Sequence, residues 1–177
     1  MKPSPHPSAS KVGSLTLAEL HSLGDETVRE LLAGFVPLTH ASEIAIWVKD
    51  PAADQLVGLL ETAGPEGEFE MKVTQLLGGG IVTQVYCDQT DHIDQGMWRD
   101  KGHSPLVDEQ LQQLTMHEMC VPFHLAGHPL GVMSAVQLND PKHNPPSRWG
   151  FDDEDLKTLK LAALALSQAM ERALLTK

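Results

Sequence analysis

The spacing of hydrophobic and polar positions changes along this 177-residue chain and predicts both helices and strands. Residues 15–23 repeat their apolar side chains at helical spacing and end at Gly24, and Asp25 is a candidate N-cap for a second helix. Residues 43–48 and 55–62 are rich in apolar and β-branched residues and flank a proline-containing turn. They therefore predict a β-hairpin.

The middle of the chain has a weaker pattern. Residues 69–73 alternate and predict a short third strand. Residues 81–86 follow three glycines and fit either a helix or a strand by periodicity, and we favour the helix. Residues 88–115 are polar and irregular, apart from a short helix expected at 107–114. A polar stretch of this length between strands is usually a functional loop.

Two stronger strands, 118–125 and 130–138, are expected to form a second hairpin through a turn that contains glycine and proline. A long helix is then predicted to begin at Asp152 or Asp153, with acidic residues in its first turn.

This last helix is apolar on two faces. The first face has 4-3-4-3 spacing and consists of Leu159, Ala163, Leu166, Met170 and Ala173. The other apolar face is centred on Leu161 and Leu164. A helix with two apolar faces needs two partners, which are the sheet of its own domain and either the first helices or a second subunit. The 4-3-4-3 spacing leads us to expect a homodimer.

The composition narrows the class of protein. The chain has 13 basic and 24 acidic residues and a formal charge of −11, which argues against nucleic-acid binding. It has neither an apolar stretch long enough to span a membrane nor an apolar N-terminal signal, so we expect a cytoplasmic protein. In that reducing compartment, Cys87 and Cys120 are expected to be free thiols. Residues 1–14 are expected to be a flexible tail and residues 15–177 a single domain.

Three motifs resemble the GAF domain family. Residues 120–139 are similar to its late hairpin, residues 80–85 to its Gly-Ile-x-Gly-x-Val segment, and residues 151–156 to its Phe-x-x-x-Asp helix entry. The resemblance covers roughly residues 15–175. It implies a PAS-like α+β fold with three layers, α/β/α: a central antiparallel sheet has the N- and C-terminal helices on one face and a ligand pocket under a loop or helix lid on the other.

Transferred to this sequence, the resemblance also implies which residues line the pocket. These candidates are Thr83, Val85, Tyr86, Cys87, His92, Asp94 and Trp98. The predicted strand 118–125 adds one of its faces, which is either Cys120 with Pro122 or Met119 with Val121, and strand alternation leaves both open. Pro122 lacks a backbone donor and is expected at a sheet edge or a bulge.

Cyclic-nucleotide phosphodiesterases and cyclases contain the GAF domains that this chain most resembles. Their Asn-Lys…Phe-x-x-x-Asp-Glu pattern is matched by Asn139, Phe151 and Asp155, but its Lys and Glu positions hold other residues, which are Asp140 and Leu156. The Lys–Asp ion pair of the pattern is therefore absent as written, with Lys142 as a candidate substitute. Three acidic residues in the expected lid also disfavour an anionic ligand.

Other chemistries have less support in the sequence. Residues 87–94 contain a thiol, an imidazole and three carboxylates, which suggests metal or redox sensing, although their spacing is not that of a structural zinc site. A covalent bilin is disfavoured because neither cysteine precedes a histidine. Familiar catalytic motifs are absent, and the two cysteines do not reproduce the set used by GAF-fold methionine-sulfoxide reductases, so we expect no enzyme activity.

The expected function is that of a sensory or regulatory domain in a signal-transduction protein. A small-molecule ligand, whether a cyclic nucleotide or another compound, would bind under a mobile lid and modulate a homodimer formed by the N- and C-terminal helices. One alternative is a ligand-free GAF scaffold for dimerisation or partner docking. The other is a metal- or redox-sensing GAF domain.

Overall fold

The computed structural model describes residues 12–62, 70–96, 105–139 and 146–176. Its six strands form one antiparallel sheet in the order β3-β2-β1-β6-β5-β4. The strands are β1 (Glu43–Lys49), β2 (Gln55–Glu61), β3 (Thr74–Leu76), β4 (His92–Gln95), β5 (Thr115–Leu125) and β6 (His128–Leu138). The helices are α2 (Leu17–Leu23), α3 (Glu26–Phe35), α4 (Ile81–Asp88), α5 (Pro105–Leu111) and α6 (Asp153–Thr176).

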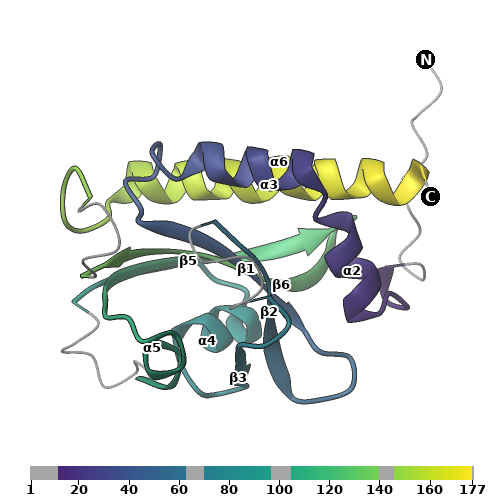
Figure 1. The fold of residues 1–177 in the computed structure, drawn as a ribbon, viewed down its shortest axis with the longest axis horizontal. Coiled ribbons are helices and arrows are strands. Elements are labelled where there is room, and N and C mark those ends of the chain that lie inside the picture. The colour runs from purple at the N-terminus through teal and green to yellow at the C-terminus, as the bar shows by residue number, and fades with distance from the viewer. Residues whose placement is uncertain (1–11, 63–69, 97–104, 140–145, 177) are drawn as a thin grey trace.

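Helices cover both faces of the sheet (Figure 1). The long helix α6 and helix α3 lie across one face, while α4 and α5 lie on the other. Alternation along the strands divides the core accordingly. Ile44, Ile46 and Met119 belong to a helix-side cluster with α3 and α6, whereas Trp47 and Cys120 belong to a cavity-side cluster with α4. The expected three-layer α+β fold is confirmed.

Side-chain caps set the starts of the helices as the sequence predicts. The Asp25 carboxylate accepts the backbone N–H of Val28 at 3.0 Å at the start of α3. Asp152 accepts the N–H groups of Glu154 and Asp155 at 2.9 and 3.1 Å at the start of α6. Each cap satisfies backbone donors that the first turn of a helix leaves without a partner.

The β5–β6 hairpin turns more tightly than the sequence suggests. Leu125 pairs with His128, so only Ala126 and Gly127 form the loop, and both have positive φ, at 49° and 77°. Two successive residues with positive φ are typical of a type I′ turn, whose twist suits antiparallel strands. Strand β6 therefore begins at His128, two residues before the predicted start.

The middle of the chain differs from its predicted elements in two places. The third strand lies at β3 and not at 69–73, since Thr74 and Gln75 pair with β2 while residues 70–72 form a turn. Strand β4 occupies part of the expected irregular segment and pairs with β5. A short edge strand tolerates polar residues, which explains why its pattern is hard to recognise. The helix favoured at 81–86 is confirmed as α4, and that expected at 107–114 is α5.

Helix α6 uses its 4-3-4-3 face inside its own chain. Leu159, Leu166 and Met170 are buried in the helix-side cluster, while Leu161 and Leu164 on the other face are 61% and 57% exposed. The face from whose spacing we expect a homodimer therefore packs on the sheet of its own domain. Val12 is also buried in this cluster, and residues 1–11 of the predicted tail lie outside the described residues.

Within the described ranges, none of the helices is both long and apolar enough to cross a membrane.

A candidate ligand site lined by buried carboxylates

Three acidic residues lie in one row across the cavity side of the sheet. Glu43 of β1 pairs with Val136 of β6, Val136 pairs with Glu118 of β5, and Glu118 pairs with Asp94 of β4. Residues that face each other across neighbouring strands project to the same side of a sheet. We call Glu43, Glu118 and Asp94 the carboxylate row.

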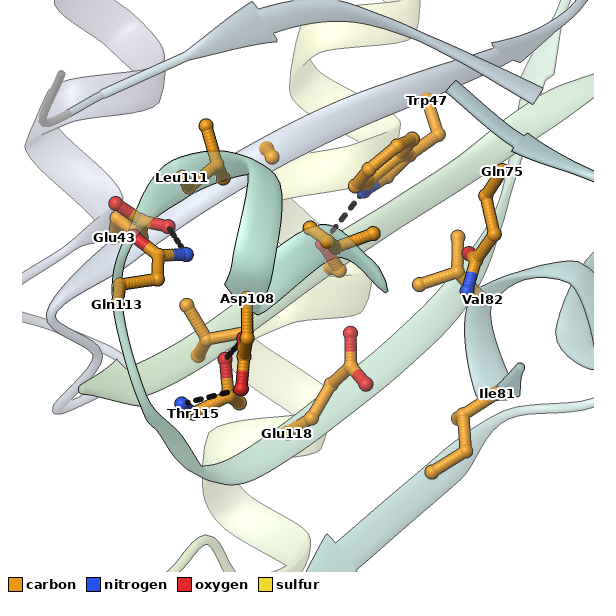
Figure 2. A pocket seen from close by; sticks show the side chains of 14 residues that line it. Glu43, Trp47, Gln75, Ile81, Val82, Asp108, Leu111, Gln113, Thr115 and Glu118 are labelled. Atoms are coloured by element: carbon orange, nitrogen blue, oxygen red, sulfur yellow. Dashed lines mark hydrogen bonds between the residues drawn. The ribbon is translucent and has the colours of Figure 1, made fainter. Parts of the chain in front are cut away.

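A cavity of about 50 Å³ lies between two members of this row, Glu43 and Glu118, and the two covering helices (Figure 2). Helix α4 contributes Ile81 and Val82, and α5 contributes Val107, Asp108 and Leu111. The remaining lining residues come from the strands and their ends: Glu43, Ala45, Trp47, Gln75, Gln113, Thr115, Glu118, Ser134 and Val136. The volume accommodates a few water molecules and is well below the ~300 Å³ or more of typical ligand pockets.

Hydrogen bonds fix the cover and floor of the cavity. Asp108 of α5 accepts the backbone N–H of Thr115 at 3.0 Å and its hydroxyl at 2.7 Å, which ties α5 to the start of β5. On the floor, the indole N–H of Trp47 donates to the Ser134 hydroxyl at 3.0 Å. All three bonds are buried, so they hold the side chains in fixed positions.

Glu118 is the most perturbed acid of the cavity. Its pKa is raised to about 7, mainly by burial; a hydrogen bond from the Cys120 thiol lowers it, and the nearby charges of Asp108 and Asp94 raise it. Burial also raises the pKa of the Cys120 thiol well above its ordinary value, with a contribution from Glu118. Near neutral pH, Glu118 is therefore divided between its protonated and ionised forms.

Gln75 of β3 adds a buried amide at the opposite wall (Figure 2). It is 7% exposed, and its Nε2 donates to the Gly79 carbonyl across 3.4 Å. Within the described part of the chain, its Oε1 is buried without a hydrogen-bond partner. An acceptor left in this state costs about 1–3 kcal/mol unless water or a ligand supplies a donor.

The predicted site residues that the structure describes are not among the residues that line this cavity. Thr83 and Val85 are buried in α4, where the Thr83 hydroxyl donates to the Gly80 carbonyl at 2.9 Å. Tyr86 packs at the edge of the cavity-side cluster, and Cys87 is exposed. Trp98 lies outside the described residues.

The two faces of β5 lie on opposite sides of the sheet. Cys120 belongs to the cavity-side cluster, and Met119 and Val121 belong to the helix-side cluster, where they pack with α6. Met119 is therefore separated from the cavity by the sheet itself.

On β4, His92 pairs with Cys120 and Asp94 with Glu118, so these two candidates lie beside the cavity face. The charge of Asp94 acts on Glu118, as its effect on the Glu118 pKa shows. Asp94 is thus the predicted residue with the clearest influence on the cavity.

Pro122 lies at a different place. Strand β4 pairs with β5 only as far as Cys120, so Pro122 lies beyond the end of β4, near the irregularity between Phe123 and His124. It lines an open groove of about 310 Å³ between β5 and α6, together with Lys160. A residue without a backbone donor fits such an edge position, as its sequence indicates.

Sequence reasoning missed the acidic lining, although a signal was present. Glu43, Ala45 and Trp47 alternate with Ile44 and Ile46, so one face of β1 begins with a carboxylate. Glu118 and Cys120 show the same arrangement on β5. Charged residues at alternating positions inside a strand pattern indicate a face that meets either solvent or a polar cavity, and the sheet order shows that it is the cavity.

An ion pair between Arg148 and Asp155 takes the place of the Lys–Asp ion pair of the cyclic-nucleotide pattern. Arg148 donates to the buried Asp155 carboxylate at 2.5 Å, and His40 contacts the other oxygen at 2.8 Å. Gln137 near the end of β6 donates to the carbonyls of His40 and Arg148 at 3.0 and 3.1 Å. Arg148 therefore makes the connection between strand end and helix that the pattern assigns to its Lys, and Lys142 lies outside the described residues.

The structure gives the metal-sensing alternative no direct support. Across the described ranges, no group of three or more His, Cys, Asp or Glu side chains is arranged to hold a metal ion. Cys87 lies at the end of α4, whereas His92 and Asp94 lie on β4.

Solved structures of other proteins share this fold. The GAF domain of a phosphoenolpyruvate-protein phosphotransferase from Coxiella burnetii superposes with a TM-score of 0.66 at 14% identity, over 96% of this chain and 98% of that one. The GAF-B domain of DevS from Mycobacterium smegmatis gives 0.58 at 20% identity, over 83% and 93%. Free methionine-R-sulfoxide reductase from Neisseria meningitidis, in complex with its substrate, gives 0.58 at 19% identity, over 98% and 99%.

A comparison with the sequences of curated proteins finds no significant match. The sequence model of the GAF domain family, in contrast, matches residues 20–170, which include the carboxylate row and both layers of helices. This chain belongs to the GAF domain family.

Proposed function

We propose that this chain is a regulatory GAF domain of a signal-transduction protein, which binds a small molecule in the cavity beneath α4 and α5. The observation that carries the proposal is the cavity on one face of the sheet, with the polar side chains of Glu118 and Gln75 buried in its walls. Similar folds in a phosphotransferase and in DevS support a role in signalling.

The two faces of the sheet suggest how binding is transmitted. Strands β5 and β6 contribute Glu118 and Ser134 to the cavity on one side, and Met119 and Ala135 to the core beneath α3 and α6 on the other. A ligand that shifts these strands also changes the surface on which α6 packs. The change in helix packing is the output, and it requires that the ligand bind one of two arrangements more tightly.

The cavity must enlarge to take a ligand of ordinary size. Helix α5 is the element best suited to move, because Val107 and Leu111 are only partly buried and Leu106 is exposed. Asp108 and Thr115 form the hydrogen bonds that hold α5 down. We infer that α5 opens as a lid when the ligand enters.

A non-catalytic role fits the thiols. A nucleophilic cysteine needs a lowered pKa and access to its substrate, but Cys120 is fully buried and its pKa is raised. Cys87 is exposed on α4 and does not line the cavity. The likeness to a methionine-sulfoxide reductase, at 19% identity, extends to the fold alone.

A ligand-free scaffold is the second candidate, and the small cavity volume of about 50 Å³ favours it. In that case the few polar atoms of the cavity are satisfied by water, and the exposed leucines of α6 serve a partner. The two candidates differ in whether the purified protein retains or takes up a small molecule in this cavity.

Native mass spectrometry of freshly purified protein tests the proposal. We expect a retained mass in the wild type and its loss in Val136→Phe, which fills the cavity between Glu43 and Glu118. Leu76→Phe is the matched control, because Leu76 is 69% exposed and lies outside the cavity lining. If the wild type carries no small molecule and takes up none from a metabolite extract, the scaffold is the better description.

A further inference from the structure

The sheet order places β3 and β4 at the two edges of the sheet. Residues 70–73 lead into β3, and residues 89–91 connect α4 to β4. Each of these two segments carries one acidic side chain, which is Glu70 in the first and Asp91 in the second. Each acid pairs with a basic residue of the helix layer that contains α3 and α6 (Figure 1).

At the β3 edge, Glu70 contacts two helices of that layer. One carboxylate oxygen accepts a hydrogen bond from Arg29 Nη1, and the other accepts one from Nη2 at 3.0 Å and lies 2.8 Å from His21 Nε2. Burial acts to raise the pKa of Glu70, but the hydrogen bonds from Arg29 and His21 outweigh it and lower the pKa. The charged carboxylate, whose side chain is 14% exposed, thus connects the entry of β3 to α2 and α3.

The same segment reaches the cavity within five residues. The Met71 N–H donates to the Gly58 carbonyl at 2.7 Å, and the Gly58 N–H donates to the Val73 carbonyl at 2.9 Å, so the segment is fixed along β2. Val73 is buried in the cavity-side cluster, and Gln75 lines the cavity. Glu70 is therefore joined to the cavity wall by a short, hydrogen-bonded piece of backbone.

At the β4 edge, Asp91 forms an ion pair with Lys160 of α6. Helix α4, which covers the cavity, ends at Asp88. Gln89 then caps it in the left-handed conformation, with its N–H donating to the Val85 carbonyl at 2.9 Å. Two residues separate the end of α4 from Asp91, so the ion pair ties the cover of the cavity to the long helix on the opposite face.

We propose that these two ion pairs couple the cavity to α3 and α6 around the edges of the sheet. A displacement of α4 pulls on α6 through Asp91 and Lys160, and a displacement of β3 pulls on α3 through Glu70 and Arg29. This route acts in addition to the one through β5 and β6. It rests on the proposed function only for the ligand that moves α4 or β3, because the coupling is a property of the free protein.

The two ion pairs should differ in strength. The side chains of Asp91 and Lys160 are 31% and 49% exposed, so salt screens their attraction. Glu70 is less exposed and accepts two hydrogen bonds from one guanidinium group, which is the stronger kind of pair. The coupling at the β4 edge should therefore weaken in high salt, and the coupling at the β3 edge should persist.

Residue-resolved hydrogen exchange of the full chain tests the β4 edge without a ligand. We expect Lys160→Gln to speed exchange at residues 85–89 of the α4 end by about two- to fivefold. Lys157→Gln is the matched control, because Lys157 lies one turn away and pairs with Glu154 of the same helix. Unchanged exchange at 85–89 in Lys160→Gln, or equal acceleration in Lys157→Gln, would overturn the inference.

A double-mutant cycle separates coupling from independent local effects. Asp91→Asn should speed exchange in α6 around Lys160, whereas Asp88→Asn, at an exposed position, should leave α6 unchanged. If the two side chains act as a pair, Asp91→Asn with Lys160→Gln accelerates exchange no more than the stronger single substitution. Effects that multiply in the double variant would show that the two residues act independently and would overturn the inference.

Arg29→Gln tests the β3 edge. We expect exchange at Met71 and in β3 to become about tenfold faster, and raised salt to leave this difference in place. Glu30→Gln changes the neighbouring, exposed position of α3 and should leave β3 unchanged. Wild-type exchange rates in β3 of Arg29→Gln would contradict the coupling at this edge.

The inference and the proposed function can fail separately. If native mass spectrometry finds a small molecule that Val136→Phe loses, but Lys160→Gln and Arg29→Gln leave the exchange of α4 and β3 unchanged, the cavity is a ligand site and the edge coupling is wrong. If the coupling is measured and no small molecule enters the cavity, the ion pairs join the two layers of a ligand-free scaffold and the proposed function is wrong.

Discussion

The carboxyl group of Glu118 connects the chemistry of the cavity to the stability of the fold. Its pKa is raised to about 7 in the folded protein, mainly by burial, from an ordinary value of 4.5. Between pH 4.5 and about pH 7, the folded state therefore keeps the Glu118 proton, whereas the unfolded state has lost it. The contribution of such a group to the free energy of unfolding is greatest below its pKa in the unfolded state. It is lost as the pH rises through its pKa in the folded state.

We predict that wild-type stability falls by about 2 kcal/mol from about pH 5.5 to pH 8 because of Glu118. Urea unfolding at the two pH values measures this change. Glu118→Gln should remove that part of the decline, and the exposed control Glu109→Gln should retain it. The prediction is contradicted if both variants follow the wild-type curve.

Arg148 is a second residue whose effect can be measured directly. It pairs with Asp155, whose side chain is 3% exposed, and with the exposed Asp152. Arg148→Ala leaves His40 as the remaining partner of a buried carboxylate, and we expect it to lower the free energy of unfolding by about 2 kcal/mol. The exposed Arg172→Ala should change it by less than about 0.5 kcal/mol. Equal effects of the two substitutions in urea unfolding would show that the ion pair contributes little.

Strands β1 and β6 approach each other so closely at Gly131 that the position excludes a side chain. A Cβ atom at Gly131 would lie 1.7 Å from the Trp47 carbonyl oxygen. In contrast, a Cβ at Gly34 in α3 meets no atom within 4 Å.

Gly131→Ala should destabilise the protein by more than about 3 kcal/mol, because the two strands must separate. Gly34→Ala should stabilise it by about 0.5–1 kcal/mol, because alanine loses less backbone entropy in a helix. Chemical denaturation of both variants checks the pair. A mild effect at Gly131 would mean that β1 and β6 lie further apart than described.

The elements show which parts of the structure can be predicted from the sequence. Hairpins, caps and the long last helix follow local patterns, and the motif in residues 120–139 identifies the fold. The cavity lining does not follow from them. Glu43 and Glu118 meet across Val136 only because β6 separates β1 from β5, an order that no local pattern encodes. Strand β4 is too short and polar for its pairing to be recognised.

In our account, the two faces of the sheet have different functions: one binds the ligand, and the other carries the helices that transmit the signal. The cavity side receives a ligand, and α6 presents Leu161, Leu164 and Leu175 on the opposite side at 61%, 57% and 44% exposure. The predicted homodimer remains a proposal, and this leucine face of α6 is where we place it. Exposed leucines on one helix are a suitable dimer surface when a second copy covers them.

The double variant Leu161→Glu/Leu164→Glu should convert a dimer to a monomer in light scattering, because the added charges would face each other in the interface. Leu76→Glu on β3 is the control and should leave the oligomeric state unchanged, since Leu76 is exposed on another part of the molecule. A wild-type monomer at high concentration would contradict the dimer and leave the cavity assignment unaffected.

Hydrogen exchange with and without a metabolite extract tests most directly whether the cavity is a ligand site that communicates with the helices. We predict slower exchange in α4 (Ile81–Asp88) and α5 (Pro105–Leu111), and a smaller change in α6 (Asp153–Thr176), in the wild type but not in Val136→Phe. Unchanged exchange in α4 and α5 with an extract from which the wild type takes up a small molecule in native mass spectrometry would contradict the account.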